Sequence, residues 1–169
     1  MNANFEKCFQ LVLQSEGGFV DNPNDPGGAT NHGVTLDSWS DFIGQTVSID
    51  QIKALTPNDV RPFYKTRYWD VLGCDQLPGG LDYCVFDFGV NSGIHRAAIS
   101  LQVVLGSHLD GIVGPQTIEA ANQQDEKTII GKYQTLRLQF LSGLQGSAYF
   151  GNGWDARVAK VTATAMEMA

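Results

Sequence analysis

The strongest constraint on the fold is an apolar stripe at helical spacing near the start of the chain. Its members recur every three or four positions: Phe5, Cys8, Phe9, Val12 and Leu13. This spacing predicts an amphipathic helix whose apolar face packs inward. Three turns beyond Phe5 the same face carries Glu16, and Gly17 and Gly18 follow at once. Glycine ends helices because it adopts the left-handed C-cap conformation without steric cost. We therefore expect Glu16 to project from the inward face at the C-terminal end of the helix.

This position is unusual for a structural glutamate. Burial and the negative end of the helix dipole both disfavour an ionised carboxyl group. The alternative is an acid at a helix end that simply points into water. The helical register and the glycine stop together favour a functional role for Glu16.

The next segment is rich in turn-forming residues. Residues 19–35, FVDNPNDPGGATNHGVT, combine Pro, Gly, Asp and Asn in a pattern typical of turns rather than of a helix or a long strand. We expect short extended pieces on either side of a tight turn, which make a small β-hairpin.

The remainder of the chain carries helical patterns. Thr56 followed by Pro57 is typical of a helix start, and Pro62 is expected to bend or delay that helix. Residues 81–90, LDYCVFDFGV, are apolar nearly all round, which fits a buried helix or a strand. The flanking helical patterns favour a buried helix. Further helices are expected around 94–105, 115–123, 126–144 and 154–168. The sequence thus predicts a mainly α (α+β) helical bundle with one small β-hairpin near the N-terminus.

Composition excludes several classes of protein. With 169 residues, 43% of them hydrophobic and 17% charged, the chain has the material for one packed domain and is not intrinsically disordered. The net charge of −7 and the absence of a basic stripe argue against nucleic-acid binding. No apolar run approaches the ~18–20 residues that span a bilayer, so no membrane insertion is expected. The first residues do not resemble a secretory signal, and we expect the chain to be made in a cytoplasm.

The cysteines and histidines do not form a recognisable metal site. Cys8, Cys74 and Cys84 lack CxxC spacing and lie beside apolar residues, so we expect buried free thiols. The three histidines are too dispersed in the sequence to suggest a ligand set.

Two carboxylates and a threonine form a candidate catalytic set. Eight residues separate Glu16 from Asp25, and four separate Asp25 from Thr30. Hydrolysis of a glycosidic bond typically needs an acid that protonates the leaving oxygen and a second carboxylate on the opposite face of the sugar. The alternatives are a turn-forming role for Asp25 and an ordinary strand position for Thr30.

These segments resemble a known family. The motifs EGGFV, DPGGAT and GVT between residues 16 and 35 are similar to the signature of glycoside hydrolase family 108, N-acetylmuramidases found among phage endolysins and secretion-associated muramidases. YKTRYW (64–69) and FDFGVNSG (86–93) resemble the family's middle segment, and residues 101–117 resemble a peptidoglycan-binding helical segment. The Glu-x8-Asp-x4-Thr spacing is one residue shorter than the Glu-x8-Asp-x5-Thr set of phage lysozymes.

The resemblance implies a lysozyme-like fold and specific roles. Glu16 matches the catalytic glutamate and becomes the general acid. Asp25 is similar to the second carboxylate, and Thr30 to the threonine that helps to hold the attacking water. The family implies no metal and no organic cofactor. We expect a single compact unit, 1–169, with a catalytic portion at 5–93 and a helical portion at 94–169 that resembles a peptidoglycan-binding segment.

Three further residues are candidate substrate contacts. Tyr64 and Trp69 could pack against the apolar face of a sugar ring, although aromatic residues at helical spacing are commonly core residues. Asn91 ends the buried segment in a turn, where an amide commonly bonds to local backbone; family analogy favours substrate contact. Asp87, within the same apolar segment, is expected to be a hydrogen-bonded structural acid.

These observations favour an N-acetylmuramidase that hydrolyses the β-1,4 bond between N-acetylmuramic acid and N-acetylglucosamine in peptidoglycan. The alternatives are a non-catalytic wall-binding or secretion accessory module, and a lytic transglycosylase that uses one glutamate. Because the chain is acidic, it gains no long-range attraction to the carboxylates of the wall. Either recognition rests on sugar contacts in the cleft, or a holin, another pore or a secretion apparatus delivers the protein from the cytoplasm to the peptidoglycan layer. A monomer is the default expectation.

Overall fold

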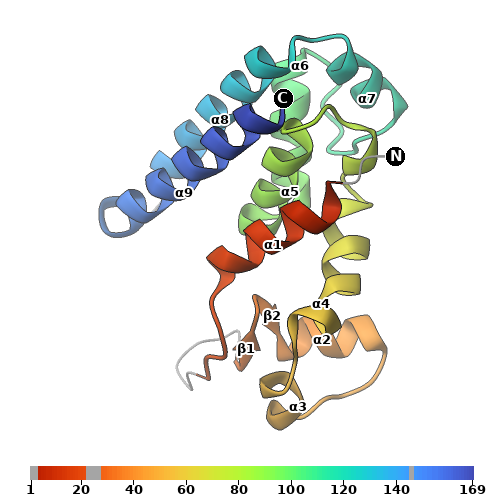
Figure 1. Cartoon of the computed structure of the whole chain (residues 1–169), viewed down its shortest axis with the longest axis vertical. Coiled ribbons are helices and arrows are strands. Elements are labelled where there is room, and N and C mark those ends of the chain that lie inside the picture. Colours follow the sequence, from red (N-terminus) through yellow and green to blue (C-terminus); the bar gives the residue numbers. More distant parts are fainter. Residues whose placement is uncertain (1–3, 22–27, 145–146) are drawn as a thin grey trace. The chain divides into compact units, whose positions relative to one another are not determined.

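The computed structural model describes residues 4–21, 28–144 and 147–169. Within them lie nine α-helices, a π-helical and a 3-10 turn, and one two-stranded antiparallel sheet (Figure 1). The predicted mainly helical class with a single small hairpin near the N-terminus is confirmed.

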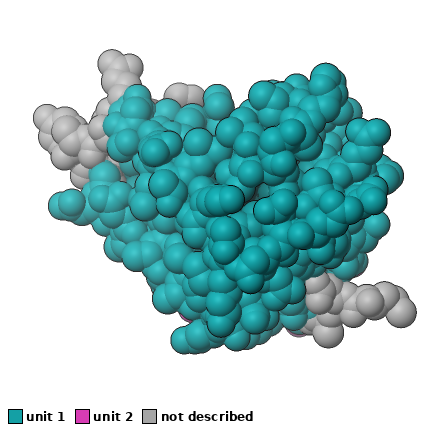
Figure 2. Space-filling model, turned by 90° about the horizontal axis from the view of Figure 1, so that it is seen from above, with its two compact units in different colours: residues 1–8, 68–169 teal, residues 9–67 magenta. Residues whose placement is uncertain are grey.

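The chain forms two compact units, which are described separately. Residues 9–67 make one, called here the hairpin unit; residues 1–8 and 68–169 make the other, called the helical unit. Figure 2 shows a face of the helical unit in teal. The predicted division into a catalytic portion (5–93) and a helical portion (94–169) concerns function and stays a prediction.

Helix α1 (Phe5–Glu16) has the bounds that the apolar stripe predicted. Phe5 and Val12 are buried on its inward face, and Glu16 on the same face is partly buried. Gly17 follows with a φ of +71°, which is the left-handed conformation that ends a helix.

The predicted β-hairpin consists of β1 (Thr30–Asn31) and β2 (Val34–Thr35). Thr30 pairs with Thr35, and Asn31 pairs with Val34. The two turn residues, His32 and Gly33, have φ values of +49° and +74°. Positive φ at both central residues identifies a type I′ turn, whose twist matches that of the flanking strands.

Three short helices complete the hairpin unit: α2 (Leu36–Ile43), α3 (Ile49–Lys53) and α4 (Pro57–Tyr64). Their N-caps, Thr35, Ser48 and Thr56, each form a capping box. The predicted start at Thr56 and Pro57 is confirmed. Pro62 lies inside α4 and does not delay its start at Pro57, although it cannot donate the usual hydrogen bond to the carbonyl of residue 58; the predicted bend stays a prediction. A π-helical turn, η1 (Lys65–Trp69), follows.

The helical unit is organised around α5 (Leu81–Ser92), which packs against α6 (Ile94–Leu105), α8 (Glu126–Ser142) and α9 (Ser147–Met168). Residues 81–89 are all buried, as expected of a segment that is apolar on every side. A 3-10 turn, η2 (Cys74–Gln76), precedes α5, and α7 (Pro115–Asn122) packs on α6 (Figure 1). None of the described helices is long and apolar enough to cross a membrane.

Candidate active site

The carboxyl group of Glu16 lies against the turn of the β-hairpin. A Cβ atom added to Gly33 would lie 2.9 Å from Oε2 of Glu16 and 3.2 Å from its Cβ. Glycine is therefore required at position 33 for two reasons: the positive φ of the turn and the closeness of the glutamate. The end of α1 and the hairpin turn together define the position of this acid.

Tyr64 supports the turn. Its hydroxyl group donates a hydrogen bond of 2.8 Å to the backbone carbonyl of His32. Its ring is buried and packs on Phe9 of α1, with 5.5 Å between ring centroids. A Cβ at Gly33 would also collide with the Tyr64 hydroxyl. Tyr64 therefore joins α1, the hairpin turn and α4 through one side chain.

This placement gives Tyr64 a different role from the predicted sugar contact. Only 1% of the residue is exposed, and its hydroxyl is used by the protein backbone. A ring without an exposed face offers no stacking surface to a sugar. We assign Tyr64 to the support of the site.

Asn31 fixes the other side of the hairpin, and the sequence analysis did not identify it. Its amide donates to the backbone carbonyls of Ile52, Lys53 and Leu55 at 3.0–3.2 Å. These carbonyls lie at and just after the end of α3, where helical carbonyls lack partners within the helix. The feature of the sequence that could have identified Asn31 is a polar residue in a short predicted strand next to a tight turn. Its partners, 21 to 24 residues away, could not be read from the sequence.

Thr30 lies on β1 with its backbone paired on both sides. Its N–H and carbonyl groups exchange 2.8 Å hydrogen bonds with Val20, and it also pairs with Thr35. Its hydroxyl donates to the carbonyl of Gly28 at 3.3 Å. Asp25, the predicted second carboxylate, lies outside the described residues. The described structure thus brings Glu16, the hairpin turn and Tyr64 together.

Comparison with known proteins identifies the family of this site. The family model for glycosyl hydrolase 108 matches residues 9–93. The chain belongs to the glycosyl hydrolase 108 family. The matched segment contains all the predicted site residues: Glu16, Asp25, Thr30, Tyr64, Trp69 and Asn91.

A solved structure, that of SagA from Brucella abortus, is 39% identical in sequence to this glycosyl hydrolase and has a TM-score of 0.88. The alignment covers 98% of this chain and 95% of SagA. The similarity therefore extends through the helical portion that follows the family match, and the predicted lysozyme-like fold class is confirmed. No curated protein matches the chain.

Trp69 of this glycosyl hydrolase lies in the core of the helical unit. It is fully buried, and its indole N–H donates to Asp75 at 2.9 Å. The rings of Phe5 and Phe86 pack against it edge-on, with centroid distances of 5.4 and 5.3 Å. Because protein atoms cover its ring, Trp69 offers no stacking surface to a sugar, and it is a core residue rather than the predicted sugar contact.

Asn91 is partly exposed in the last turn of α5. Its Oδ1 accepts a hydrogen bond of 3.3 Å from Arg137 and one of 3.2 Å from the Ser92 hydroxyl. Asp87, one turn earlier, forms ion pairs with Arg137 at 2.7 Å and with Arg157 at 2.9 Å. The prediction that Asp87 is a hydrogen-bonded structural acid is confirmed.

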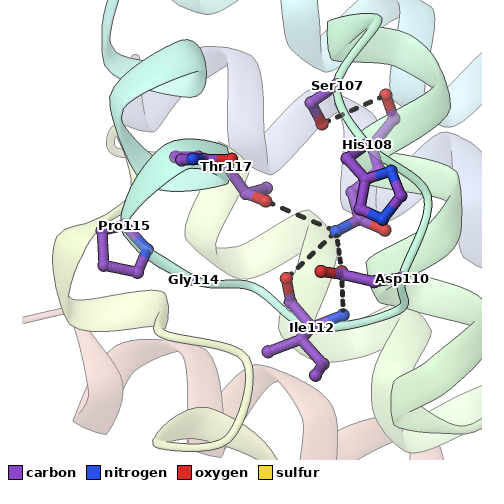
Figure 3. A pocket seen from close by; sticks show the side chains of 9 residues that line it. Ser107, His108, Asp110, Ile112, Gly114, Pro115 and Thr117 are labelled. Atoms are coloured by element: carbon purple, nitrogen blue, oxygen red, sulfur yellow. Dashed lines mark hydrogen bonds between the residues drawn. The ribbon is translucent and has the colours of Figure 1, made fainter.

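The segment that resembles a peptidoglycan-binding motif uses its polar groups internally. The buried Gln102 amide donates to Asp110 at 2.6 Å and to the carbonyl of Ile112 at 3.0 Å (Figure 3). It also accepts from the N–H of Gly111 at 2.9 Å. The Gln102 amide lowers the pKa of Asp110, and the N–H of Ile112 lowers it further. A cavity of about 360 Å³ lies beside this loop. The motif therefore shapes the loop between α6 and α7.

Burial determines the direction of the pKa shifts of the three cysteines and of Asp82. Burial raises the pKa of all three cysteine thiols, which are free and buried as predicted. Burial also raises the pKa of Asp82, and its hydrogen bonds from Asn4 and Tyr83 oppose this shift. Among the described residues, no group of three or more His, Cys, Asp or Glu side chains could hold a metal ion.

Proposed function

We propose that this glycosyl hydrolase is an N-acetylmuramidase that cleaves the β-1,4 bond between N-acetylmuramic acid and N-acetylglucosamine in peptidoglycan. The observation that carries the proposal is the position of Glu16. Its carboxyl group lies at the end of a helix and against a turn to which the Tyr64 hydroxyl is hydrogen-bonded. A proton donor must be held in a fixed position relative to the leaving oxygen, and two rigid elements provide this. Glu16 is the general acid.

Asp25 is the second carboxylate in this proposal. With the help of Thr30, it activates a water molecule on the face of the sugar opposite Glu16, and the anomeric carbon is inverted. Thr30 is partly buried on β1, three residues before Gly33, which lies against Glu16; this position is consistent with a role in holding that water. Proton NMR of the first-formed anomer tests the stereochemistry: retention would assign Asp25 as a nucleophile instead.

Delivery by another component fits the charge of the protein. The chain carries a net charge of −7, and peptidoglycan carries free carboxylates, so long-range attraction does not bring the two together. We propose that a holin or a secretion apparatus releases the enzyme locally from the bacterial cytoplasm to the peptidoglycan layer, where it acts as a monomer.

The test is digestion of purified sacculi by the wild type, Glu16→Gln and Glu6→Gln. Glu6 is an exposed acid in the first turn of the same helix, so its variant controls for loss of a carboxylate from α1. Loss of a general acid typically lowers the rate by about a hundred- to ten-thousandfold. We expect this loss for Glu16→Gln and near wild-type turbidity loss for Glu6→Gln. Lysis by Glu16→Gln at the wild-type rate would remove Glu16 from the mechanism.

Mass spectrometry of the products separates the alternatives. New reducing N-acetylmuramic acid ends support a muramidase. Ends with 1,6-anhydromuramic acid identify a lytic transglycosylase. Binding to sacculi without new ends of either kind identifies a wall-binding or secretion accessory module, the alternative that the acidic charge favours.

A further inference from the structure

His32 occupies a position in the hairpin turn that disfavours a residue with a β-carbon. Within the described part of the chain it is the only residue other than glycine with a positive φ, at +49°. Type I′ turns favour asparagine, aspartate or glycine at this position, because most side chains are strained in the left-handed conformation. The turn therefore does not carry the residue that would stabilise it best.

The surrounding structure holds this strained backbone in place. The Tyr64 hydroxyl donates a hydrogen bond of 2.8 Å to the carbonyl of His32. Before it in the chain, the Asn31 amide donates to three carbonyls at the end of α3; after it, Gly33 lies against Glu16. A sparsely populated backbone conformation persists where neighbouring contacts determine it, and such residues cluster at ligand-binding and catalytic sites. The backbone from which the His32 side chain projects is therefore fixed.

His32 lies close to the proposed general acid, and both residues belong to the hairpin unit. A Cβ atom added to Gly33 would lie 2.9 Å from Oε2 of Glu16. Because consecutive α-carbons are about 3.8 Å apart, the α-carbon of His32 lies within about 8 Å of this carboxyl oxygen. When the linkage oxygen of a glycan contacts Glu16, the substituents of the two linked sugars come within the same range of His32.

Stability does not account for the imidazole ring of His32. The residue is partly exposed, and no described residue forms a hydrogen bond, an ion pair or a ring contact with its side chain. Asparagine at this position would suit the turn better and would remove nothing that the described fold uses. A role toward a ligand explains why a histidine is placed beside the acid.

The chemistry of an imidazole suits a carboxylate. A ring N–H donates a hydrogen bond in either protonation state, and the protonated ring adds a positive charge. Hydrogen bonds between charged groups are about twice as strong as neutral ones. N-acetylmuramic acid carries a lactyl group that ends in a carboxylate or in a stem peptide with carboxylates, and N-acetylglucosamine carries neither. Since the chain has a net charge of −7, a local donor beside the acid offsets the lack of long-range attraction to such a substrate.

We infer that His32 is a specificity-determining residue of the proposed active site, and that its imidazole donates a hydrogen bond to a carboxylate carried by N-acetylmuramic acid. This carboxylate belongs to the free lactyl group or to the first residues of the stem peptide. The inference rests on the proposed function and names the feature of the substrate that distinguishes peptidoglycan from an uncharged glycan.

His32→Asn provides the sharpest test. Asparagine suits the turn and lacks the imidazole, so the unfolding temperature should equal or exceed that of the wild type. Calorimetry at about pH 6, in the range in which histidine gains its charge, measures the Kd for three tetrasaccharides. These are tetra-N-acetylchitotetraose, two linked N-acetylglucosamine–N-acetylmuramic acid units with free lactyl groups, and the same units bearing L-alanyl-D-glutamate. Glu16→Gln in both proteins keeps the tetrasaccharides intact during the measurement.

We expect His32→Asn to raise the Kd about five- to tenfold for at least one tetrasaccharide that bears carboxylates and to leave the Kd for chitotetraose unchanged. A rise for the free lactyl form alone identifies the lactyl carboxylate, and a rise for the dipeptide form alone identifies the stem peptide. A rise for both shows that His32 reaches either carboxylate. Unchanged Kd values, or an equal rise for all three tetrasaccharides, overturn the inference.

His95→Asn is the matched control. His95 is an exposed histidine in the first turn of α6, so the same change is made in the helical unit and leaves the hairpin turn intact. All three Kd values should stay at their wild-type level. In NMR spectra, the ring signals of His32 should shift with a carboxylate-bearing tetrasaccharide and not with chitotetraose. A purely structural histidine would give ring signals that respond to neither.

The same measurements separate this inference from the proposed function. If the wild type releases no new ends from sacculi but His32→Asn weakens binding of the carboxylate-bearing tetrasaccharides alone, the muramidase proposal fails and the carboxylate contact stands. If the enzyme cleaves sacculi and His32→Asn changes no Kd, the inference fails and the function stands.

Discussion

The hydroxyl group of Tyr64 donates a 2.8 Å hydrogen bond to the backbone carbonyl of His32, at the first of the two positions in the hairpin turn. The second position, Gly33, contacts the carboxyl group of Glu16. A side chain of α4 thus determines where the end of α1 meets the hairpin, and the predictions below test this relationship first.

Tyr64→Phe removes only the hydroxyl that holds the turn. We expect a loss of about 1–2 kcal/mol in the free energy of unfolding, because the His32 carbonyl loses its partner. We also expect kcat/KM on peptidoglycan to fall by about tenfold or more, since the turn beside Glu16 is no longer fixed. Urea denaturation and release of reducing ends measure the two effects.

Tyr133→Phe is the matched control for that variant. Tyr133 is also buried and donates to a backbone carbonyl, that of Ala97, at 3.1 Å in the helical unit. Its loss should cost a similar amount of stability and leave kcat/KM unchanged. Equal loss of activity in both variants would show that the effect of Tyr64 arises from general destabilisation.

Gly33→Ala places a methyl group between Glu16 and Tyr64. Alanine in a left-handed conformation costs about 1–2 kcal/mol, and the clash adds about 1–3 kcal/mol. We expect kcat/KM to fall by about a hundredfold, because the glutamate must move. Gly44→Ala is the control: Gly44 has a φ of +73° and no atom within 4 Å of an added Cβ. Comparable activity in the two variants would contradict the proposed contact.

Asp82→Asn should change how stability depends on pH. Asp82 is fully buried, and burial raises its pKa in the folded state above the unfolded value of about 3.9. The folded wild type therefore binds a proton before the unfolded chain does as the pH falls. Wild-type stability should rise relative to Asp82→Asn as the pH falls through the folded pKa, with no further change below the unfolded value.

Chemical denaturation of both proteins at a series of pH values measures this difference. Asp59, Asp110 and Asp125 have lowered pKa values because of local hydrogen bonds, so acid removes their stabilising effect in both proteins alike. The comparison with Asp82→Asn therefore isolates Asp82. A difference in unfolding free energy that is independent of pH would show that Asp82 has the same pKa in both states.

The three cysteines should be unreactive in the native enzyme. Cys8, Cys74 and Cys84 are fully buried, and burial raises the pKa of each thiol, so little reactive thiolate is present. Ellman's reagent at about pH 8 should label no thiol in the folded protein and all three after unfolding in guanidinium. Rapid labelling of a native thiol would indicate local opening of the core around α5.

The local elements of this protein could be predicted from its sequence. The apolar stripe and the two glycines that follow it predicted the bounds of α1. The turn-forming residues between positions 19 and 35 predicted the hairpin. The Thr56–Pro57 signal gave the start of α4, and the continuous apolar pattern of residues 81–90 gave the buried α5. These features depend on backbone conformation and periodicity, which neighbouring residues determine.

The roles of individual side chains depended on the tertiary structure. The sequence alone determined that Glu16 ends an inward-facing helix surface, because register and helix termination are local properties. It could not determine that Tyr64 is buried against the hairpin turn and that Trp69 is buried in the core. An aromatic residue at helical spacing is compatible with a core and also with a sugar cleft. Nor could it pair Asn31 with the end of α3 or Arg137 with Asp87 and Asn91. Only the packing of distant segments decides those partners, because hydrogen bonds and ion pairs act over a few ångströms between residues that are far apart in the chain.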